Sequence, residues 1–373
     1  MRENKIFKLI DFWIGIPLCM FLGLITKILY KKGLNKPIAK ILFIKLSALG
    51  DTILILPLLK EIKNQIPGVR LSMVVTEINN GALENFKYID NLILFEPKEY
   101  ILNPFGFISF FSKLRTNRYD IVIDADQWLR ISAIISFFTF AKMRIGFKTK
   151  GQFNYYCFTE IVKHRKDEHE LECFFELVKP IGIIPENKGL IPLHGNSDIK
   201  KSEELLRRYN IGPEFIVLHP EVPSHGKQRA WPLENFALLA EKLKQSYDYK
   251  IVITSSANGR KLADKLNQLL RNSGVVISGL PLKILSAFVS KARFVICSNT
   301  GFMHLAAASG TKVIALHGPT NSIKWGPYGE KHITINSSTD CSPCLYLGFE
   351  YKCHSNKCMQ AITAEDVFDL VKK

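Results

Sequence analysis

The fold of this chain is decided by the segment FVICSNTGFMHLAAA at residues 294–308. Its first four residues are apolar and indicate a buried strand, and the small and polar residues after them open a helix. The first turn of a helix has unpaired N–H groups and a partial positive charge, so it attracts phosphate. Gly301 lets an anionic group approach the backbone closely. We therefore expect a phosphate-bearing ligand at this junction.

A second buried strand follows at once, KVIAL at residues 312–316, and it ends in HGPT at residues 317–320. Two neighbouring strands that each release a polar loop form the crevice in which open α/β sheets hold ligands. The pair of junctions therefore predicts a nucleotide or sugar-nucleotide site.

The rest of the chain fits two α/β domains. With 373 residues, of which 47% are hydrophobic, the chain can bury two ordinary cores. Strand and helix patterns alternate over residues 41–147 and again over 215–316, which implies parallel sheets with helices on both faces. We expect two Rossmann-like domains that face a central cleft, at residues 37–185 and 186–373. An N-terminal apolar helix at residues 1–36 precedes them.

The charge balance is basic, with 50 Lys and Arg against 34 Asp and Glu and a net charge of +16. Such a balance suits an anionic partner, namely nucleic acid, an acidic membrane surface or a phosphorylated substrate. We expect no nucleic-acid partner, because the chain has no recognisable zinc finger, helix-turn-helix or aromatic-basic RNA motif. The remaining alternative is that surplus lysine only keeps the surface soluble.

The N-terminus contains an apolar run at residues 12–25, shorter than the roughly twenty residues that a spanning helix needs. Its apolar residues recur at helical spacing, Lys8 and Lys27 flank it, and Trp13 lies near one end. This pattern is typical of a helix that lies in the face of an anionic membrane. A signal peptide, a tilted single span and an extra core helix remain as alternatives.

A further motif follows the first strand, KLSALGDT at residues 45–52. Gly50 permits a sharp turn, and Asp51 stands where a helix begins. By position alone Asp51 is a helix N-cap, since a carboxylate there is stabilised by the helix dipole.

Four motifs together resemble glycosyltransferase family 9, the family of ADP-heptose:lipopolysaccharide heptosyltransferases. They are KLSALGDT at 45–52, WPLENF at 231–236, TGFMHLA at 300–306 and GPT at 318–320, and they stand in the family's order. The resemblance runs from residue 38 to the C-terminus, and the N-terminal helix lies outside it.

The resemblance implies a GT-B fold, inversion at the anomeric centre and no cofactor for catalysis. The first domain would bind the acceptor, a lipopolysaccharide core, and the second the donor, ADP-heptose. Asp51 would be the general base for the acceptor hydroxyl, and no acceptor-binding residue is assigned. Thr300 and Gly301 would hold the pyrophosphate, and His304 would either contact phosphate or support the loop. Such an enzyme works on the cytoplasmic face of the bacterial inner membrane.

The chain departs from the family pattern in the donor domain. Arg229 stands where the family usually has Lys, with Lys227 nearby. Because arginine can bind phosphate through two nitrogens, we expect both residues near the donor, a solvated basic loop being the alternative. Asn299 replaces a common Asp, which keeps hydrogen bonding but loses the charge. No acidic residue suited to ribose follows the predicted strand at 250–254.

These departures leave two other functions open. One is a transferase of the same fold that uses another nucleotide sugar. The other is a membrane-docked protein that binds a nucleotide sugar without catalysis, in which Asp51 survives only as a helix cap.

Four of the eight cysteines lie close together, at Cys341, Cys344, Cys353 and Cys358. Four thiols at such spacing suit a structural zinc ion, although the second pair is irregular. Reduced or redox-labile thiols are the alternative, and disulfides are disfavoured in the cytosol.

Overall fold

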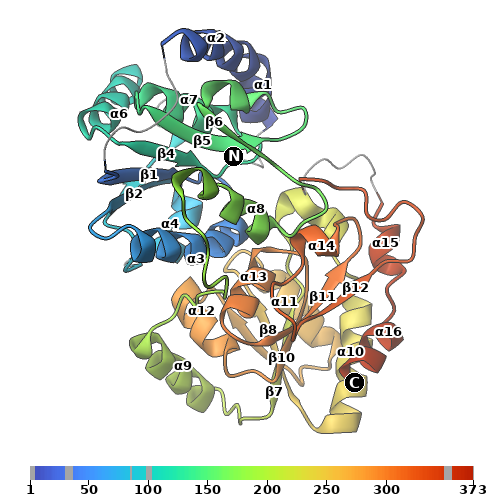
Figure 1. Cartoon of the computed structure of the whole chain (residues 1–373). Coiled ribbons are helices and arrows are strands. Elements are labelled where there is room, and N and C mark those ends of the chain that lie inside the picture. The colour runs from blue at the N-terminus through green and yellow to red at the C-terminus, as the bar shows by residue number, and fades with distance from the viewer. Residues whose placement is uncertain (1–4, 30–36, 85, 98–102, 348–354, 373) are drawn as a thin grey trace. The chain divides into compact units, whose positions relative to one another are not determined.

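Figure 1 shows a computed structural model of the chain, which describes residues 5–29, 37–84, 86–97, 103–347 and 355–372. The chain forms two compact units, Met1–Lys188 (unit 1) and Gly189–Lys373 (unit 2). Each unit contains one six-stranded sheet, and all strand pairs described in both sheets are parallel. The parallel sheets predicted for both halves are therefore confirmed.

The sheet of unit 1 has the order β3-β2-β1-β4-β5-β6, so the order reverses between β1 and β4. The central strand β1, of sequence KILFI, is buried on both faces apart from its first residue, as expected for a parallel sheet covered by helices. Its strands are β1 (Lys40–Ile44), β2 (Arg70–Val75), β3 (Asn91–Leu94), β4 (Ile121–Asp124), β5 (Met143–Lys148) and β6 (Glu160–Lys163). Its helices are α1 (Lys5–Trp13), α2 (Gly15–Leu29), α3 (Leu49–Gln65), α4 (Glu77–Leu83), α6 (Pro104–Thr116), α7 (Arg130–Phe138), η1 (Asn154–Cys157), α8 (Glu170–Glu176) and η2 (Lys179–Ile181).

The sheet of unit 2 repeats this plan with the order β12-β11-β10-β7-β8-β9, and its order reverses between β7 and β10. The strands predicted over 294–297 and 312–316 are neighbours, as expected. Its strands are β7 (Phe215–His219), β8 (Lys250–Ser255), β9 (Val275–Ser278), β10 (Phe294–Ser298), β11 (Lys312–His317) and β12 (Ile333–Asn336). Its helices are α9 (Asn196–Arg208), η3 (Ser224–Arg229), α10 (Leu233–Tyr247), α11 (Arg260–Leu269), α12 (Leu282–Val289), α13 (Gly301–Ala308), α14 (Ser322–Trp325), α15 (Lys357–Gln360) and α16 (Ala364–Val371).

The motif WPLENF starts α10 and ties it to the C-terminal segment of unit 2. Trp231 is buried, packs on Phe236 and donates from its indole nitrogen to the carbonyl of Ile362 at 2.8 Å. Directly after Ile362, Thr363 and Asp366 form a capping box that begins α16. The Trp-Pro motif therefore has a structural role in this chain.

The N-terminal segment is helical and apolar, as predicted. Residues Phe7–Ile28 form a candidate membrane span by length and composition, with a mean hydropathy of 2.0. The helix is longer than the predicted 12–25 and divides into α1 and α2 at Ile14. The lysines between residues 31 and 36 lie outside the described residues.

Two histidines at the carboxyl ends of strands in unit 2 are buried and neutral. Burial lowers the pKa of His219 and of His317 to about 3. The ring of His219 stacks on Phe302 at 3.8 Å, and its Nδ1 lies 3.0 Å from the Thr254 hydroxyl. In the unfolded chain this imidazole has a pKa of about 6.5 and can bind a proton. In the folded chain it must stay neutral to keep this packing.

We predict that acid destabilises unit 2 through these histidines. The pKa of His219 is about 3 in the fold and about 6.5 in the unfolded chain. At pH values between these two, the unfolded chain binds one proton more than the folded chain does. Each histidine thus costs about 1.4 kcal/mol of stability for each pH unit below 6.5. His219→Gln should reduce the stability difference between pH 7.5 and pH 5.0 by about 2 kcal/mol. Denaturant unfolding at the two pH values measures this, and an unchanged difference would refute it.

Candidate active site

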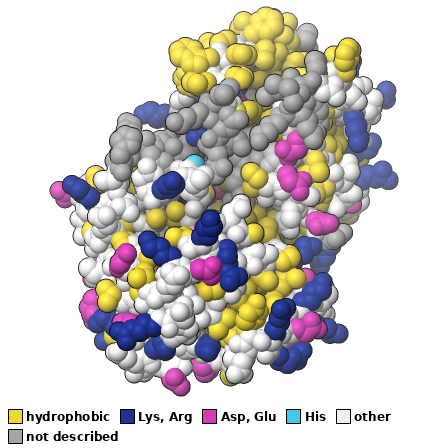
Figure 2. Space-filling model, turned by 180° about the vertical axis from the view of Figure 1, so that it is seen from behind, with side chains coloured by type: hydrophobic (Ala, Val, Ile, Leu, Met, Phe, Trp, Pro, Cys, Tyr) yellow, Lys and Arg dark blue, Asp and Glu magenta, His cyan; other side chains and the backbone are white. Residues whose placement is uncertain are grey.

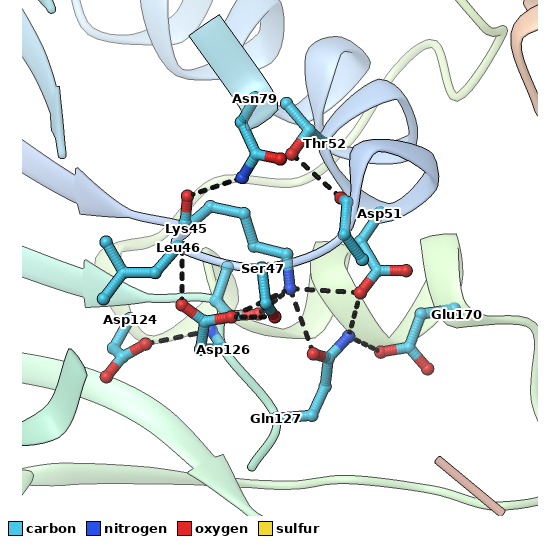
Figure 3. Close-up of polar contacts among 12 residues, drawn as sticks. Lys45, Leu46, Ser47, Asp51, Thr52, Asn79, Asp124, Asp126, Gln127 and Glu170 are labelled. Carbon is cyan, nitrogen blue, oxygen red and sulfur yellow. Dashed lines mark hydrogen bonds and ion pairs between the residues drawn. The ribbon is translucent and has the colours of Figure 1, made fainter. Parts of the chain in front are cut away.

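The carboxyl end of β1 is followed by a buried ammonium group, that of Lys45, whose residue is 0% exposed. Its Nζ lies 3.0 Å from Gln127 Oε1, 3.1 Å from Asp51 Oδ2 and 3.3 Å from Asp126 Oδ1 (Figure 3). It also donates to the carbonyl of Ala125 at 3.2 Å. A buried charge is tolerated when it is paired and hydrogen-bonded, so Lys45 holds the loops after β1 and β4 together.

Asp126 supplies a carboxylate counter-ion to Lys45 and fixes the loop after β1. Its Oδ2 accepts from the backbone nitrogen of Leu46 at 2.6 Å, and its Oδ1 accepts from the hydroxyl of Ser47 at 2.7 Å. Burial, and then the charge of Asp126, raise the pKa of the neighbouring Asp124 well above its usual range. The loop after β1 is thus held at the point where the strand order reverses, which is where open α/β sheets bind ligands.

Asp51 lies in the first turn of α3, and Ala48 is the N-cap residue of that helix. The expected position of Asp51 at the helix start is therefore refined to its third residue. Ala48 has a φ of 67°, an uncommon conformation for a residue with a Cβ, so the surrounding contacts hold this turn under strain. The Asp51 carboxylate is only 6% exposed and accepts from Gln127 Nε2 at 3.1 Å (Figure 3). Together Lys45 and Gln127 orient this carboxylate.

A chain of buried hydrogen bonds supports Gln127 from behind. Its Nε2 donates to Glu170 Oε1 at 2.7 Å, and Glu170 Oε2 lies 3.0 Å from His164 Nε2. The other ring nitrogen of His164 lies 3.2 Å from the hydroxyl of Thr149. Because both oxygen and nitrogen of the Gln127 amide are engaged, the rotamer that faces Asp51 is fixed. Sequence reasoning did not find Gln127 or Glu170, since each is a single polar residue with no motif around it.

Potential metal ligands gather in one place among the residues that the structure describes. His164, Glu170 and Cys173 offer ligand atoms within 4.8 Å of one another, and all three residues are buried. The predicted cysteine group differs, because Cys341 and Cys344 are exposed whereas Cys358 is buried.

The fourth predicted ligand, Cys353, lies outside the described residues. The three described thiols of this group do not all come within 4.8 Å of one another. Two of these residues, Cys344 and Cys358, nevertheless lie against one turn at Gly318 and Pro319. The backbone nitrogen of Cys344 donates to Pro319 O at 3.0 Å, and a Cβ built on Gly318 would lie 3.0 Å from Cys358 Sγ.

In unit 2 the structure brings Arg229 to Asn299. Arg229 is buried, and its Nη1 donates to the carbonyl of Asn299 at 3.1 Å and to its side-chain oxygen at 3.3 Å. The amide nitrogen of Asn299 donates to the carbonyl of Trp325 at 2.6 Å. An aspartate here would lose this donor, which gives the asparagine a physical reason. Lys227, two residues before Arg229, is exposed.

Thr300 is the N-cap residue of α13, and Gly301 is the first residue of the helix, as expected for a phosphate-binding turn. Among the described residues, three buried atoms near it lack a hydrogen-bond partner, namely Thr300 Oγ1, Ser298 Oγ and His317 Nε2. Buried polar atoms without partners are costly and uncommon, and a bound ligand would satisfy them.

His304 and His317 belong to the same neighbourhood as Arg229. After burial, the charges of His304 and then Arg229 lower the pKa of His317. His304 is buried on α13, three residues after Gly301. Three nitrogen-bearing side chains thus surround the start of α13, a setting that favours an anion. His317 begins the polar loop that the sequence predicted beside this junction, although the sequence assigned it no individual role.

Glu221 supplies the carboxylate that the sequence lacks after β8. Its Oε1 accepts from the hydroxyl of Ser256, and its Oε2 accepts from the backbone nitrogen of Ser256, both at 2.6 Å. A Cβ at position 259 would lie 2.2 Å from Glu221 Oε2, so Gly259 makes room for this carboxylate. The sequence hides this contact because Glu221 follows β7, whereas Ser256 follows the neighbouring β8.

Comparison with known proteins covers most of the chain. The family model of glycosyltransferase family 9 (heptosyltransferase) matches residues 107–354. The lipopolysaccharide core heptosyltransferase OpsX of Haemophilus influenzae is 23% identical over 343 residues, which cover 88% of this chain and 95% of the relative.

Solved structures share the fold. A glycosyl transferase family 9 protein from Veillonella parvula superposes with a TM-score of 0.75 at 20% identity, covering 91% of this chain and 98% of that one. The ADP-heptose lipopolysaccharide heptosyltransferase II of Escherichia coli gives a TM-score of 0.69 at 18% identity, with coverages of 89% and 97%.

The family match spans more than half of the chain, and the fold agrees over nine-tenths of it. The resemblance seen in the four sequence motifs is therefore confirmed, as is the two-domain GT-B class. The chain belongs to glycosyltransferase family 9, the heptosyltransferases, and is a glycosyltransferase.

Proposed function

We propose that this protein moves a heptose, or a related sugar, from an ADP-sugar to the core of a lipopolysaccharide, with inversion and without a metal ion in the chemistry. The observation that carries the proposal is the carboxylate of Asp51, held at the reversal point of the first sheet by Lys45 and Gln127. The named relatives that act on lipopolysaccharide, one of them on ADP-heptose, support the choice of substrates.

Asp51 would act as the general base. It would take the proton of the acceptor hydroxyl while that oxygen forms a bond to the anomeric carbon of the sugar. The bond between this carbon and the phosphate oxygen breaks at the same time, and ADP leaves with the electron pair. Attack from the side opposite to the leaving group inverts the anomeric centre. The contacts to Lys45 and Gln127 limit the motion of the carboxylate, so it would be oriented before the acceptor arrives.

The donor would bind at the start of α13. The backbone N–H groups of Thr300 and Gly301 and the hydroxyl of Thr300 would donate hydrogen bonds to the pyrophosphate, and Arg229 would neutralise the charge that develops on the leaving ADP. Asn299 would hold Arg229 in place, and His304 would line the same turn. Glu221 would face the ribose, since a carboxylate readily accepts hydrogen bonds from two neighbouring hydroxyls. No residue for the acceptor is proposed.

We propose the cytoplasmic face of the bacterial inner membrane as the place of action. Nucleotide sugars and a lipid-linked acceptor meet at that surface, and the apolar N-terminal helices supply a means of reaching it. The net charge of +16 suits an anionic acceptor and anionic lipid.

We propose that a structural zinc ion, where one is bound, belongs to the cysteine group of Cys341, Cys344, Cys353 and Cys358. Both ring nitrogens of His164 are already hydrogen-bonded, and Glu170 is engaged by Gln127, so the His164 group has a full structural role without metal. The two exposed thiols are accessible to an ion. The ion would stabilise the loop and take no part in transfer.

The first prediction concerns the base. Asp51→Asn should lower the transfer rate from ADP-heptose to a panel of truncated lipopolysaccharides by about 10²–10⁴-fold, because the amide cannot take the proton. ADP-heptose should bind unchanged, since its site lies in unit 2. Asp264→Asn, an exposed carboxylate on α11, is the matched control and should transfer normally. Undiminished transfer by Asp51→Asn would refute the assignment of the base. If the unmutated protein bound ADP-heptose but transferred no sugar, a non-catalytic binding protein would be favoured.

The second prediction concerns the donor. Arg229→Ala should weaken ADP-heptose binding by about 10- to 100-fold, because a charge-assisted contact to phosphate is lost. Arg229→Lys should recover part of the loss, whereas Lys227→Ala should change binding less than about threefold because that side chain is exposed. Calorimetry with ADP-, GDP- and UDP-sugars measures the affinities. Tighter binding of a GDP- or UDP-sugar than of ADP-heptose would indicate another donor.

The third prediction concerns the metal. Purified protein should retain zinc in near-stoichiometric amount, and Cys341→Ser with Cys344→Ser should remove it. Cys173→Ser, in the His164 group, is the matched control and should keep it. Elemental analysis measures the content, and loss of zinc from the Cys173 variant alone would reverse the assignment.

A further inference from the structure

The helices α1 and α2 pack on the rest of unit 1 through one face that carries buried polar contacts. The carboxylate of Asp11 accepts from the backbone nitrogens of Arg130 and Ile131 at 3.0 and 3.1 Å, at the start of α7, and pairs with the Arg130 guanidinium at 3.1 Å. The hydroxyl of Thr26 accepts from Arg144 at 3.0 Å. A helix that left unit 1 to cross a bilayer would carry Asp11 into hydrocarbon and break these contacts.

The opposite face of the same helices is apolar and exposed. Of the 22 exposed large apolar side chains among the described residues, nine lie on this short segment. They are Leu9, Ile10, Phe12, Trp13, Ile14, Met20, Phe21, Leu24 and Ile28. Figure 2 shows hydrophobic side chains gathered at the top of the molecule, the end that carries α2 in Figure 1. We call this set the outer face.

The low burial of this segment rules out an ordinary core helix. Only 33% of its most apolar window is buried. A soluble surface seldom leaves so many large apolar side chains together, and such a patch marks an interaction site.

A pocket opens in the outer face between α2 and η1. It has a volume of about 310 Å³ and is lined by Met20, Phe21, Gly23, Leu24, Lys27 and Tyr156. A Cβ on Gly23 would lie 2.8 Å from the Cβ of Tyr156, so the glycine lets α2 approach η1 closely. The walls are apolar, and the only charged group among the lining residues is the Lys27 ammonium. Apolar walls with one cation suit the chain and headgroup of an anionic lipid.

We propose that the outer face lies in the plane of an anionic bilayer while α1 and α2 stay docked on unit 1, and that the pocket takes one lipid acyl chain. A bilayer fits better than a second copy because the chain carries a charge of +16, which repels a copy and attracts acidic lipid. Trp13, at 70% exposure, is suited to the membrane interface. The choice also rests on the proposed function, whose acceptor is lipid-linked.

Vesicle binding tests the face. The full-length protein should co-sediment with phosphatidylglycerol–phosphatidylcholine vesicles and bind phosphatidylcholine alone much less. Leu24→Ser should weaken binding about tenfold, whereas Ile78→Ser on α4 should leave it unchanged. The two side chains are matched at 60% and 62% exposure. Lys27→Glu should reduce the preference for anionic vesicles. Equal loss in the Leu24 and Ile78 variants, or dimerisation that depends on Leu24, would overturn the proposal.

Two further measurements test the docked state and the pocket. Cys157 is buried in a cluster that contains Cys19 and Leu22 of α2, so it should stay protected from a water-soluble maleimide on vesicles. Labelling of Cys157 upon vesicle binding would mean that α2 leaves unit 1. A phosphatidylglycerol with a diazirine in one acyl chain should crosslink to Tyr156, and its absence from that residue would refute the pocket's role. Neither measurement uses a sugar donor or acceptor. If the membrane proposal is wrong, sugar transfer measured in detergent should therefore still occur.

Discussion

The buried ammonium of Lys45 is the constraint on which the rest of unit 1 depends. A charge withdrawn from water is costly unless its donors are satisfied, and the acceptors of Lys45, which itself follows β1, come from the loop after β4 and from the first turn of α3. If these segments separated, the Lys45 ammonium would remain buried without its acceptors, which is energetically costly. Their position at the reversal of strand order is therefore fixed, and Asp51 and Gln127 are fixed with them. The buried Lys45 ammonium therefore gives the Asp51 carboxylate a defined position at this point of the sheet.

The candidate donor site of unit 2 has the opposite arrangement. Whereas Lys45, Asp51 and Gln127 hydrogen-bond to one another, Thr300, Ser298 and His317 each present a buried atom without a partner among the described residues. Such atoms lower the stability of the empty site, and a ligand that supplies the missing hydrogen bonds restores it. A satisfied frame suits a group that must keep its position during proton transfer. An unsatisfied frame suits a site that binds a donor and releases ADP.

Much of this architecture could be predicted from local sequence. The apolar strands, the helix start at Thr300 and the position of Asp51 follow from composition and periodicity over a few residues. Gln127 and Glu170 could not be found in this way, because their roles depend on which strands are neighbours. Strand order is a long-range property, and no local pattern reports it. The carboxylate at Ser256 was missed for the same reason, since it arrives from the loop of an adjacent strand.

The loop after β4 connects the candidate base to the helices of the outer face. Asp126 and Gln127, at its start, hold Lys45 and Asp51. Three residues later Arg130 begins α7 and is fixed by the carboxylate of Asp11 from α1. The residues between are too few to act as a flexible linker, since an extended residue spans only about 3.5 Å. The docked helices therefore stabilise the segment that orients the base. If the outer face lies on lipid, this rigid connection sets the height of Asp51 above the membrane, which is the distance an acceptor hydroxyl must reach.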